Sequence, residues 1–240
     1  MLLVNVSQMN EKLKITLKGS VNILPLLIPV VPFGIILGAI GIELGFSVLE
    51  TFATSFVIFG GASQIVFLQL LSGGASQIIA VSSAFVVNSR HFLYGATFSE
   101  YLNKLPMGWK IILSYLLTDQ AFAVSNTYFR ANENNSLKHY YLLGSGFTLW
   151  SIWQISTLLG IFLGSIVPDE LGLAYTIPLT FIALLVNYFR KIDHLIVILV
   201  SGILSLLLFN APLKSYIILS SLTALFVGFL IIKFKKGNNS

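Results

Sequence analysis

Polar residues that could do chemistry stand in the middle of three apolar segments between residues 60 and 120. They are Ser63 and Gln64, then Asn88, Arg90 and His91, then Thr118, Asp119 and Gln120. A charged group at the centre of a membrane helix costs about 3 kcal/mol on insertion scales. A chain keeps such a group mainly where it faces a bundle interior or a wet cavity. These residues are therefore the first candidates for function.

Arg90 and Asp119 form the combination best suited to a ligand that carries both charges. Counted from the polar turn between their two segments, they lie at depths of about 12 and 18 Å at 1.5 Å per residue, so we predict an ion pair. The guanidinium or the N-terminus of a broken helix can bind a carboxylate, and the aspartate can bind an ammonium group. His91 and Asp119 are also candidates for proton coupling. The alternative is a structural ion pair that joins two helices.

The composition indicates that these segments lie in a membrane. Of the 240 residues, 56% are hydrophobic and 10% are charged, and the mean hydropathy is +0.89. Apolar runs recur along almost the whole chain, which predicts an all-α, polytopic membrane protein with about eight transmembrane segments, seven being possible. We expect a cytoplasmic lead at 1–18, a single transmembrane transporter domain at 19–233 and a cytoplasmic tail at 234–240.

The distribution of Lys and Arg favours eight segments with both termini in the cytoplasm. The predicted segments are 19–44, 48–71, 76–98, 107–129, 140–167, 172–189, 195–209 and 213–232. In this arrangement most basic residues lie inside, as membrane proteins prefer. Lys104 and Lys110 argue against it because both would lie outside. A re-entrant third segment, which would give seven crossings, is the alternative.

The first predicted segment contains three prolines, Pro25, Pro29 and Pro32, followed by Gly34. Each proline removes a backbone donor and displaces the carbonyl four residues earlier, so we expect a broken helix. Transporters use broken helices near the midplane to bind carboxylates and ions. We therefore expect Pro32 and Gly34 to contribute to substrate binding, with a kinked packing helix as the alternative.

Glycines mark two further places of close approach. Gly60 and Gly61 are adjacent in the second segment, where they weaken a helix and admit a ligand or another backbone. Gly160-x-x-x-Gly164 in the fifth segment predicts a packing face for another helix. The full candidate substrate site comprises Pro32, Gly34, Gly60, Gly61, Ser63, Gln64, Asn88, Arg90, Asp119 and Phe122.

No enzyme signature accompanies these residues. The sequence lacks H-E-x-x-H, G-x-S-x-G and P-loop motifs, and it contains no cysteine for a thiolate metal site. We therefore predict no enzyme activity, no cofactor and no metal. The net charge of +5 reflects short basic loops, so no nucleic-acid partner is expected. The alternative function is an intramembrane enzyme that uses His91 and Asp119 as an acid–base pair.

Several motifs in their order resemble the AzlC family of branched-chain amino acid permeases. They are Phe59-Gly-Gly-Ala-Ser-Gln64, Arg90-His-Phe-Leu-Tyr-Gly95 and Leu117-Thr-Asp-Gln-Ala-Phe122, within a resemblance that extends from about residue 19 to 190. Gln120 departs from the family, which usually has an acidic residue there. The resemblance implies the large subunit of a two-component exporter of leucine, isoleucine and valine. We expect it in the plasma membrane, driven by protons or another ion, because the sequence has no nucleotide-binding motif. The resemblance also implies a small AzlD-like membrane subunit as partner.

Overall fold

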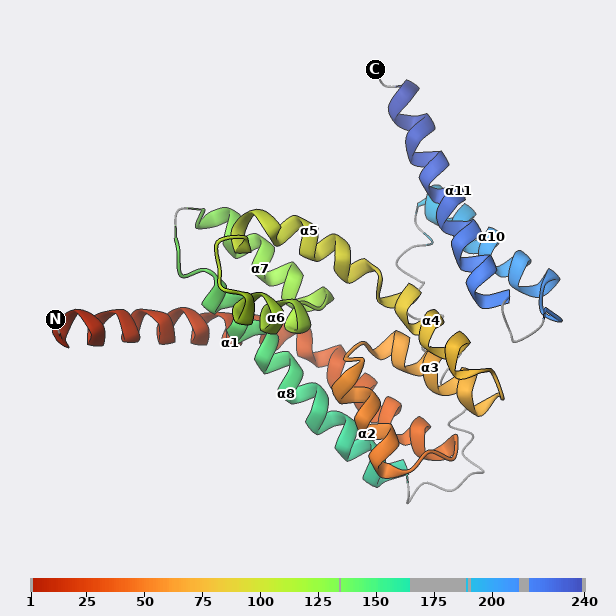
Figure 1. The fold of residues 1–240 in the computed structure, drawn as a ribbon, viewed down its shortest axis with the longest axis horizontal. Helices are drawn as coiled ribbons and strands as arrows, with labels where there is room; N and C mark the ends of the chain where they lie inside the picture. Colours follow the sequence, from red (N-terminus) through yellow and green to blue (C-terminus); the bar gives the residue numbers. More distant parts are fainter. Residues whose placement is uncertain (1, 134, 165–188, 190, 212–215, 239–240) are drawn as a thin grey trace. The chain divides into compact units, whose positions relative to one another are not determined.

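The computed structural model describes residues 2–133, 135–164, 189, 191–211 and 216–238 (Figure 1). These residues form ten α-helices and no strand, which confirms the all-α prediction. The predicted sixth segment, 172–189, lies outside the described residues except for Phe189. The chain divides into two compact units. Residues 1–42, 46–61 and 88–166 form the first unit, and residues 43–45, 62–87 and 167–240 form the second.

Two long helices, α1 (Leu2–Glu43) and α8 (His139–Gly164), form the centre of the first unit. Both are long and apolar enough to cross a membrane, α1 from Glu11 onward. Their backbones touch, because a Cβ atom at Gly144 would overlap the carbonyl of Thr16 and one at Gly160 would overlap the carbonyl of Ile35. The Gly160-x-x-x-Gly164 packing face is thus confirmed, and α1 is the helix that covers it.

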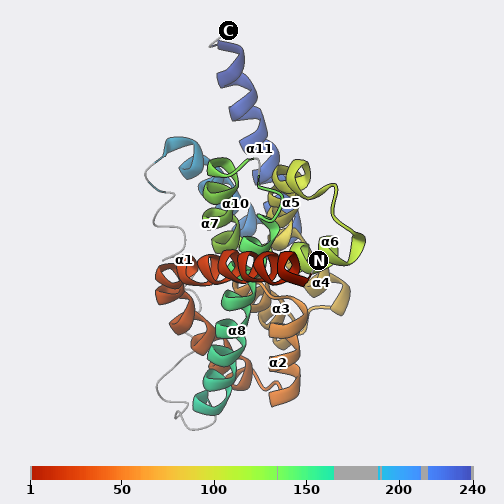
Figure 2. The same cartoon turned by 90° about the vertical axis from the view of Figure 1, so that its left-hand side faces the viewer.

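The predicted break in the first helix is wrong, because α1 continues as one helix through Pro25, Pro29 and Pro32. The three prolines are spaced four and three residues apart, so they share one face of the helix, and all three are exposed. The missing hydrogen bonds therefore fall on one side, while the opposite side stays bonded and packs against α8. The helix bends instead of breaking, and Figure 2 shows its axis changing direction.

Three segments that the sequence predicted as single helices are each divided in two. The pairs are α2 (Val48–Val57) with α3 (Gly61–Ser72), α4 (Gln77–Asn88) with α5 (Arg90–Leu102), and α6 (Met107–Leu116) with α7 (Asp119–Ala131). Non-helical backbone separates two of the pairs, with Phe59 at a φ of 42° and Leu117 at a ψ of 77°, whereas Ser89 between α4 and α5 keeps helical dihedral angles. Such breaks are only one to three residues long, so they leave the hydropathy of a segment unchanged.

The second unit contains α3, most of α4 and a hairpin of α10 (Ile192–Leu207) and α11 (Tyr216–Asn238). Small residues of α11 face α10, since Ala224 is buried and a Cβ atom at Gly228 would lie 3.2 Å from a methyl group of Val197. The ammonium of Lys235 lies 2.6 and 2.8 Å from the two carboxylate oxygens of Asp193, which ties the end of α11 to the start of α10.

Candidate functional site

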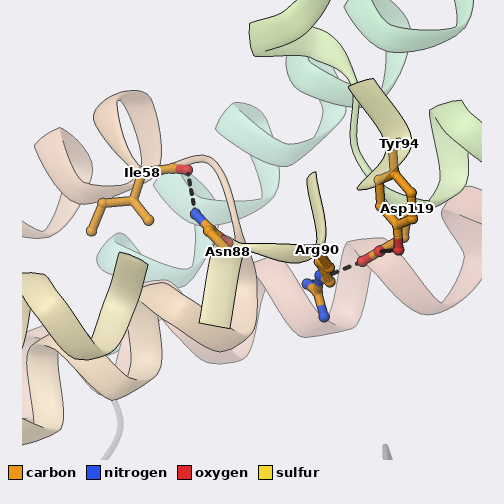
Figure 3. A network of polar contacts seen from close by, with 5 residues as sticks. All are labelled: Ile58, Asn88, Arg90, Tyr94 and Asp119. Atoms are coloured by element: carbon orange, nitrogen blue, oxygen red, sulfur yellow. Dashed lines mark hydrogen bonds and ion pairs between the residues drawn. The ribbon is translucent and has the colours of Figure 1, made fainter. Parts of the chain in front are cut away.

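The structure confirms the ion pair between Arg90 and Asp119, with 3.0 Å between Nη2 and Oδ2 (Figure 3). Each residue is the first of a helix, Arg90 of α5 and Asp119 of α7. A helix N-terminus carries partial positive charge, so it stabilises Asp119 and disfavours Arg90. The negative charge of Asp119 compensates for the unfavourable position of Arg90 at a helix N-terminus. The ion pair also joins the start of α5 to the start of α7.

Tyr94 completes the coordination of the carboxylate, and the sequence analysis did not assign it to the site. Its hydroxyl donates a hydrogen bond to Oδ1 of Asp119 at 2.5 Å (Figure 3). Tyr94 stands four residues after Arg90, so both project from the same face of α5. Each oxygen of Asp119 therefore has its own partner from α5. The available signal was the Arg-x-x-x-Tyr spacing within an apolar segment.

Phe122 forms an apolar wall beside this polar centre. Its ring stacks on that of Tyr94, with the centroids 4.5 Å apart and the planes 17° from parallel. The ring of Phe98 also packs on Phe122, with centroids 5.1 Å apart. An aromatic surface next to paired opposite charges suits a ligand that is zwitterionic at one end and apolar at the other.

The ion pair is open and keeps unused donors. The side chains of Arg90 and Asp119 are 39% and 41% exposed within the chain. Two neighbouring groups, Nε of Arg90 and the hydroxyl of Thr118, are buried and have no hydrogen-bond partner among the described residues. His91 is half-buried, with its ring centroid 5.8 Å from that of Tyr94. These features leave capacity for further polar contacts.

Asn88 and the end of α2 form a second polar contact. The amide of Asn88 donates to the carbonyl oxygen of Ile58 at 3.4 Å (Figure 3). The hydroxyl of Tyr115 donates to the carbonyl oxygen of Phe56, and Nε1 of Trp150 donates to that hydroxyl at 2.9 Å. The carbonyl groups that the end of α2 leaves unpaired are thus bound by side chains, and the sequence analysis missed Tyr115.

The remaining predicted site residues have surroundings of their own. Gly34 packs against Ser156 of α8, and Pro32 is exposed on α1. Gly61, which follows Gly60, leaves room for the rings of Phe33 and Trp153, because a Cβ atom there would overlap the Phe33 ring. Ser63 and Gln64 are buried in the second unit. The structure therefore brings together Arg90, Asp119 and Phe122, and the roles of all predicted site residues in binding stay predictions.

The sequence is similar to a protein family and to several membrane proteins. The sequence model described as AzlC protein matches residues 25–167. The inner membrane protein YgaZ of Escherichia coli (strain K12) is 30% identical over 223 residues, covering 89% of this chain and 91% of the relative. An uncharacterized membrane protein of Archaeoglobus fulgidus is 32% identical over 148 residues, 62% of each chain. Another, from Helicobacter pylori (strain 26695), is 24% identical over 185 residues, covering 76% of this chain and 79% of the relative. No solved structure matches.

Proposed function

Because the chain belongs to the AzlC family and is a membrane protein like its named relatives, we propose that it is the large subunit of a secondary transporter that exports branched-chain amino acids. The observation that carries this proposal is the open Arg90–Asp119 pair beside the ring of Phe122. Leucine, isoleucine and valine combine a zwitterion with an apolar side chain, which are the two features this site offers.

The proposed binding mode uses the groups that the ion pair leaves free. The substrate carboxylate binds the remaining guanidinium donors of Arg90 and the N-terminus of α7, where Thr118 has an unpaired hydroxyl. The substrate ammonium binds Asp119, and its side chain packs on Phe122. Protonation of Asp119 would weaken its hold on Arg90 and on the ammonium group, so an ion gradient could drive release.

An intramembrane enzyme based on His91 and Asp119 has less support. The two carboxylate oxygens of Asp119 are held by Arg90 and Tyr94, and the ring contact of His91 is with Tyr94. An acid–base pair must be held within hydrogen-bond reach of one reacting proton, and among the described residues no hydrogen bond joins His91 to Asp119. Transport therefore fits this geometry better than acid–base catalysis.

We also propose a small AzlD-like membrane subunit as partner. The partner does not bind the Gly160-x-x-x-Gly164 face, because α1 covers that face. The hairpin of α10 and α11 exposes large apolar side chains, among them Leu206 and Leu207 at 78% and 75% exposure. In a membrane such side chains contact either lipid or another subunit, so this hairpin is where we expect the partner.

Proteoliposomes test the proposal directly. The chain is reconstituted with and without the AzlD-like subunit, and efflux of labelled leucine is compared with that of labelled lysine. We expect leucine efflux that requires the partner and stops when an uncoupler collapses the proton gradient. Efflux of lysine alone, or efflux that survives uncoupling and stops on ATP depletion, would contradict it.

A further inference from the structure

Contacts within the first unit show that α6 and α7 enter and leave at the same end of α8. Along α6, Trp109 packs on Tyr140 with ring centroids 5.1 Å apart. Further along, a Cβ atom at Gly146 would lie 2.8 Å from Cβ of Leu116. Residue numbers rise together on both helices, so α6 runs in the same direction as α8.

Helix α7 runs the opposite way. Tyr128 stacks on Tyr141 with centroids 4.0 Å apart, and the hydroxyls of Ser125 and Ser145 lie 3.2 Å apart. Rising numbers on α7 thus match falling numbers on α8. The chain goes in along α6, turns at Leu117 and comes back along α7.

The α6–α7 hairpin is too short to cross a bilayer. Ten residues of α6 span about 15 Å, half of a hydrocarbon core about 30 Å thick. Its tip, at Leu117 and Thr118, follows Leu116 and Tyr115, which contact Gly146 and Trp150 in the third and fourth turns of α8. Asp119 is therefore near the middle of the membrane, although both connections of the hairpin lie on one face.

That face gathers the basic residues of the first unit other than Arg90. Lys12 and Lys18 lie over the rings of Tyr140 and Tyr128, which places the start of α1 at this face as well. Its seven cations are Lys12, Lys14, Lys18, Lys104, Lys110, Arg130 and Lys138, against the three acids Glu11, Glu100 and Glu133. The sequence has no Lys or Arg from residue 19 to 89 or from 139 to 189, so the opposite end of this unit lacks them.

Lys138 is the one of these seven cations that is buried. The ammonium of Lys138 donates to the carbonyl oxygen of Glu133 at 2.9 Å and lies 4.1 Å from the centre of the Tyr101 ring. Burial lowers the pKa of this ammonium. Lys14, Lys18, Lys104 and Arg130 are exposed and remain available for an external partner.

We propose that this end is the cytoplasmic face, that the α6–α7 segment is a re-entrant hairpin opening onto it, and that its exposed cations bind the headgroups of anionic phospholipids. Basic residues favour the cytoplasmic side, and tyrosine and tryptophan favour the headgroup level. Trp109, Tyr128 and Tyr140 supply such a belt around the cations. With eight crossings, Lys104 and Lys110 would lie outside, against the preference of basic residues for the cytoplasm. The re-entrant hairpin places both lysines on the same side as the other cations.

Single-cysteine labelling tests the hairpin, and the chain has no native cysteine to remove. With a membrane-impermeant maleimide, Lys104→Cys and Ser136→Cys should react only after cells are permeabilised. Phe46→Cys, between α1 and α2 at the opposite end, should react in intact cells. Reaction of Lys104→Cys but not Ser136→Cys in intact cells would overturn the hairpin. Reaction of both there would overturn the cytoplasmic assignment.

Thermal unfolding of the purified chain in detergent tests the lipid contact. Added phosphatidylglycerol should raise the unfolding temperature more than phosphatidylcholine does. For Lys14→Gln and for Lys104→Gln, the phosphatidylglycerol concentration that gives half of this rise should increase about fivefold each. Glu100→Gln, which removes an acid from the same face, should not increase it. Wild-type behaviour of both lysine variants would overturn headgroup binding. Neither experiment depends on transport, so its result is independent of the proposed function.

Discussion

The α1–α8 contact and the Arg90–Asp119 site lie in the same unit but are held together in different ways. Between α1 and α8, backbones meet at glycines, and Leu37 and Ile40 are fully buried. At the site, short helices meet through stacked rings and an exposed ion pair. A continuous helix satisfies its own backbone groups, whereas the end of a half-helix leaves donors or acceptors free for a side chain or ligand. The comparison separates a scaffold from a region equipped to bind.

The largest effect is expected from breaking the ion pair. Asp119→Asn or Arg90→Gln should abolish transport, and each should lower the yield of folded protein because a lone charge is left near the middle of the membrane. The double variant should recover folding but not transport, since the ligand's charges still lack partners. Efflux of labelled leucine measures transport, and size-exclusion chromatography measures the yield of folded protein.

Asp193→Asn is the matched control, because Asp193 pairs with Lys235 in the other unit. We expect it to transport normally. If the double variant of Arg90 and Asp119 recovers transport as well as folding, the pair is purely structural. If Asp119→Asn transports normally, these residues are not the substrate-binding site.

A change at the α1–α8 contact should lower the stability of the protein before it affects transport. A Cβ atom in Gly160→Ala would overlap the carbonyl of Ile35, so the helices must separate, at a cost of about 2 kcal/mol. Thermal unfolding in detergent measures the loss. In Gly108→Ala the new methyl meets no atom of the described residues within 4 Å, and stability should not fall. Equal stability of the two variants would show that the α1–α8 contact is looser than described.

A smaller loss of substrate affinity is expected from changing Tyr94. Tyr94→Phe removes one hydrogen bond to the Asp119 carboxylate but keeps the stack on Phe122, so substrate affinity should fall about tenfold. Tyr101→Phe makes the same change on the same helix, where no described residue bonds the hydroxyl, and should have no effect. The apparent KM for leucine efflux distinguishes them, and identical values would mean that Tyr94 does not position Asp119.

The smallest effect concerns the bent part of α1. Pro32→Ala should reduce transport a few-fold at normal membrane insertion, if backbone groups freed by Pro32 contact the substrate. Pro25→Ala, about two turns earlier on the same face, is the control and should change transport less. Transport like that of the unaltered chain in Pro32→Ala would assign this proline to helix packing alone.

The sequence by itself determined the class of the protein and the centre of its site. Long apolar runs with few charges specify membrane helices because hydrocarbon excludes unpaired polar groups. The same cost made Arg90 and Asp119 stand out, and the rise per residue was sufficient to predict that they meet. The motifs around them indicated the AzlC family.

The tertiary structure alone decided where helices break and which way they run. Prolines predicted a break in α1, yet its bonded face packs on α8 and the helix only bends. Helix α6 ends before Leu117, where the polar residues Thr118, Asp119 and Gln120 interrupt the apolar run, and its C-terminal turn contacts Gly146 and Trp150 of α8. Hydropathy measures the transfer of side chains to lipid and is insensitive to backbone direction, so a crossing helix and a re-entrant hairpin look alike until their neighbours are known.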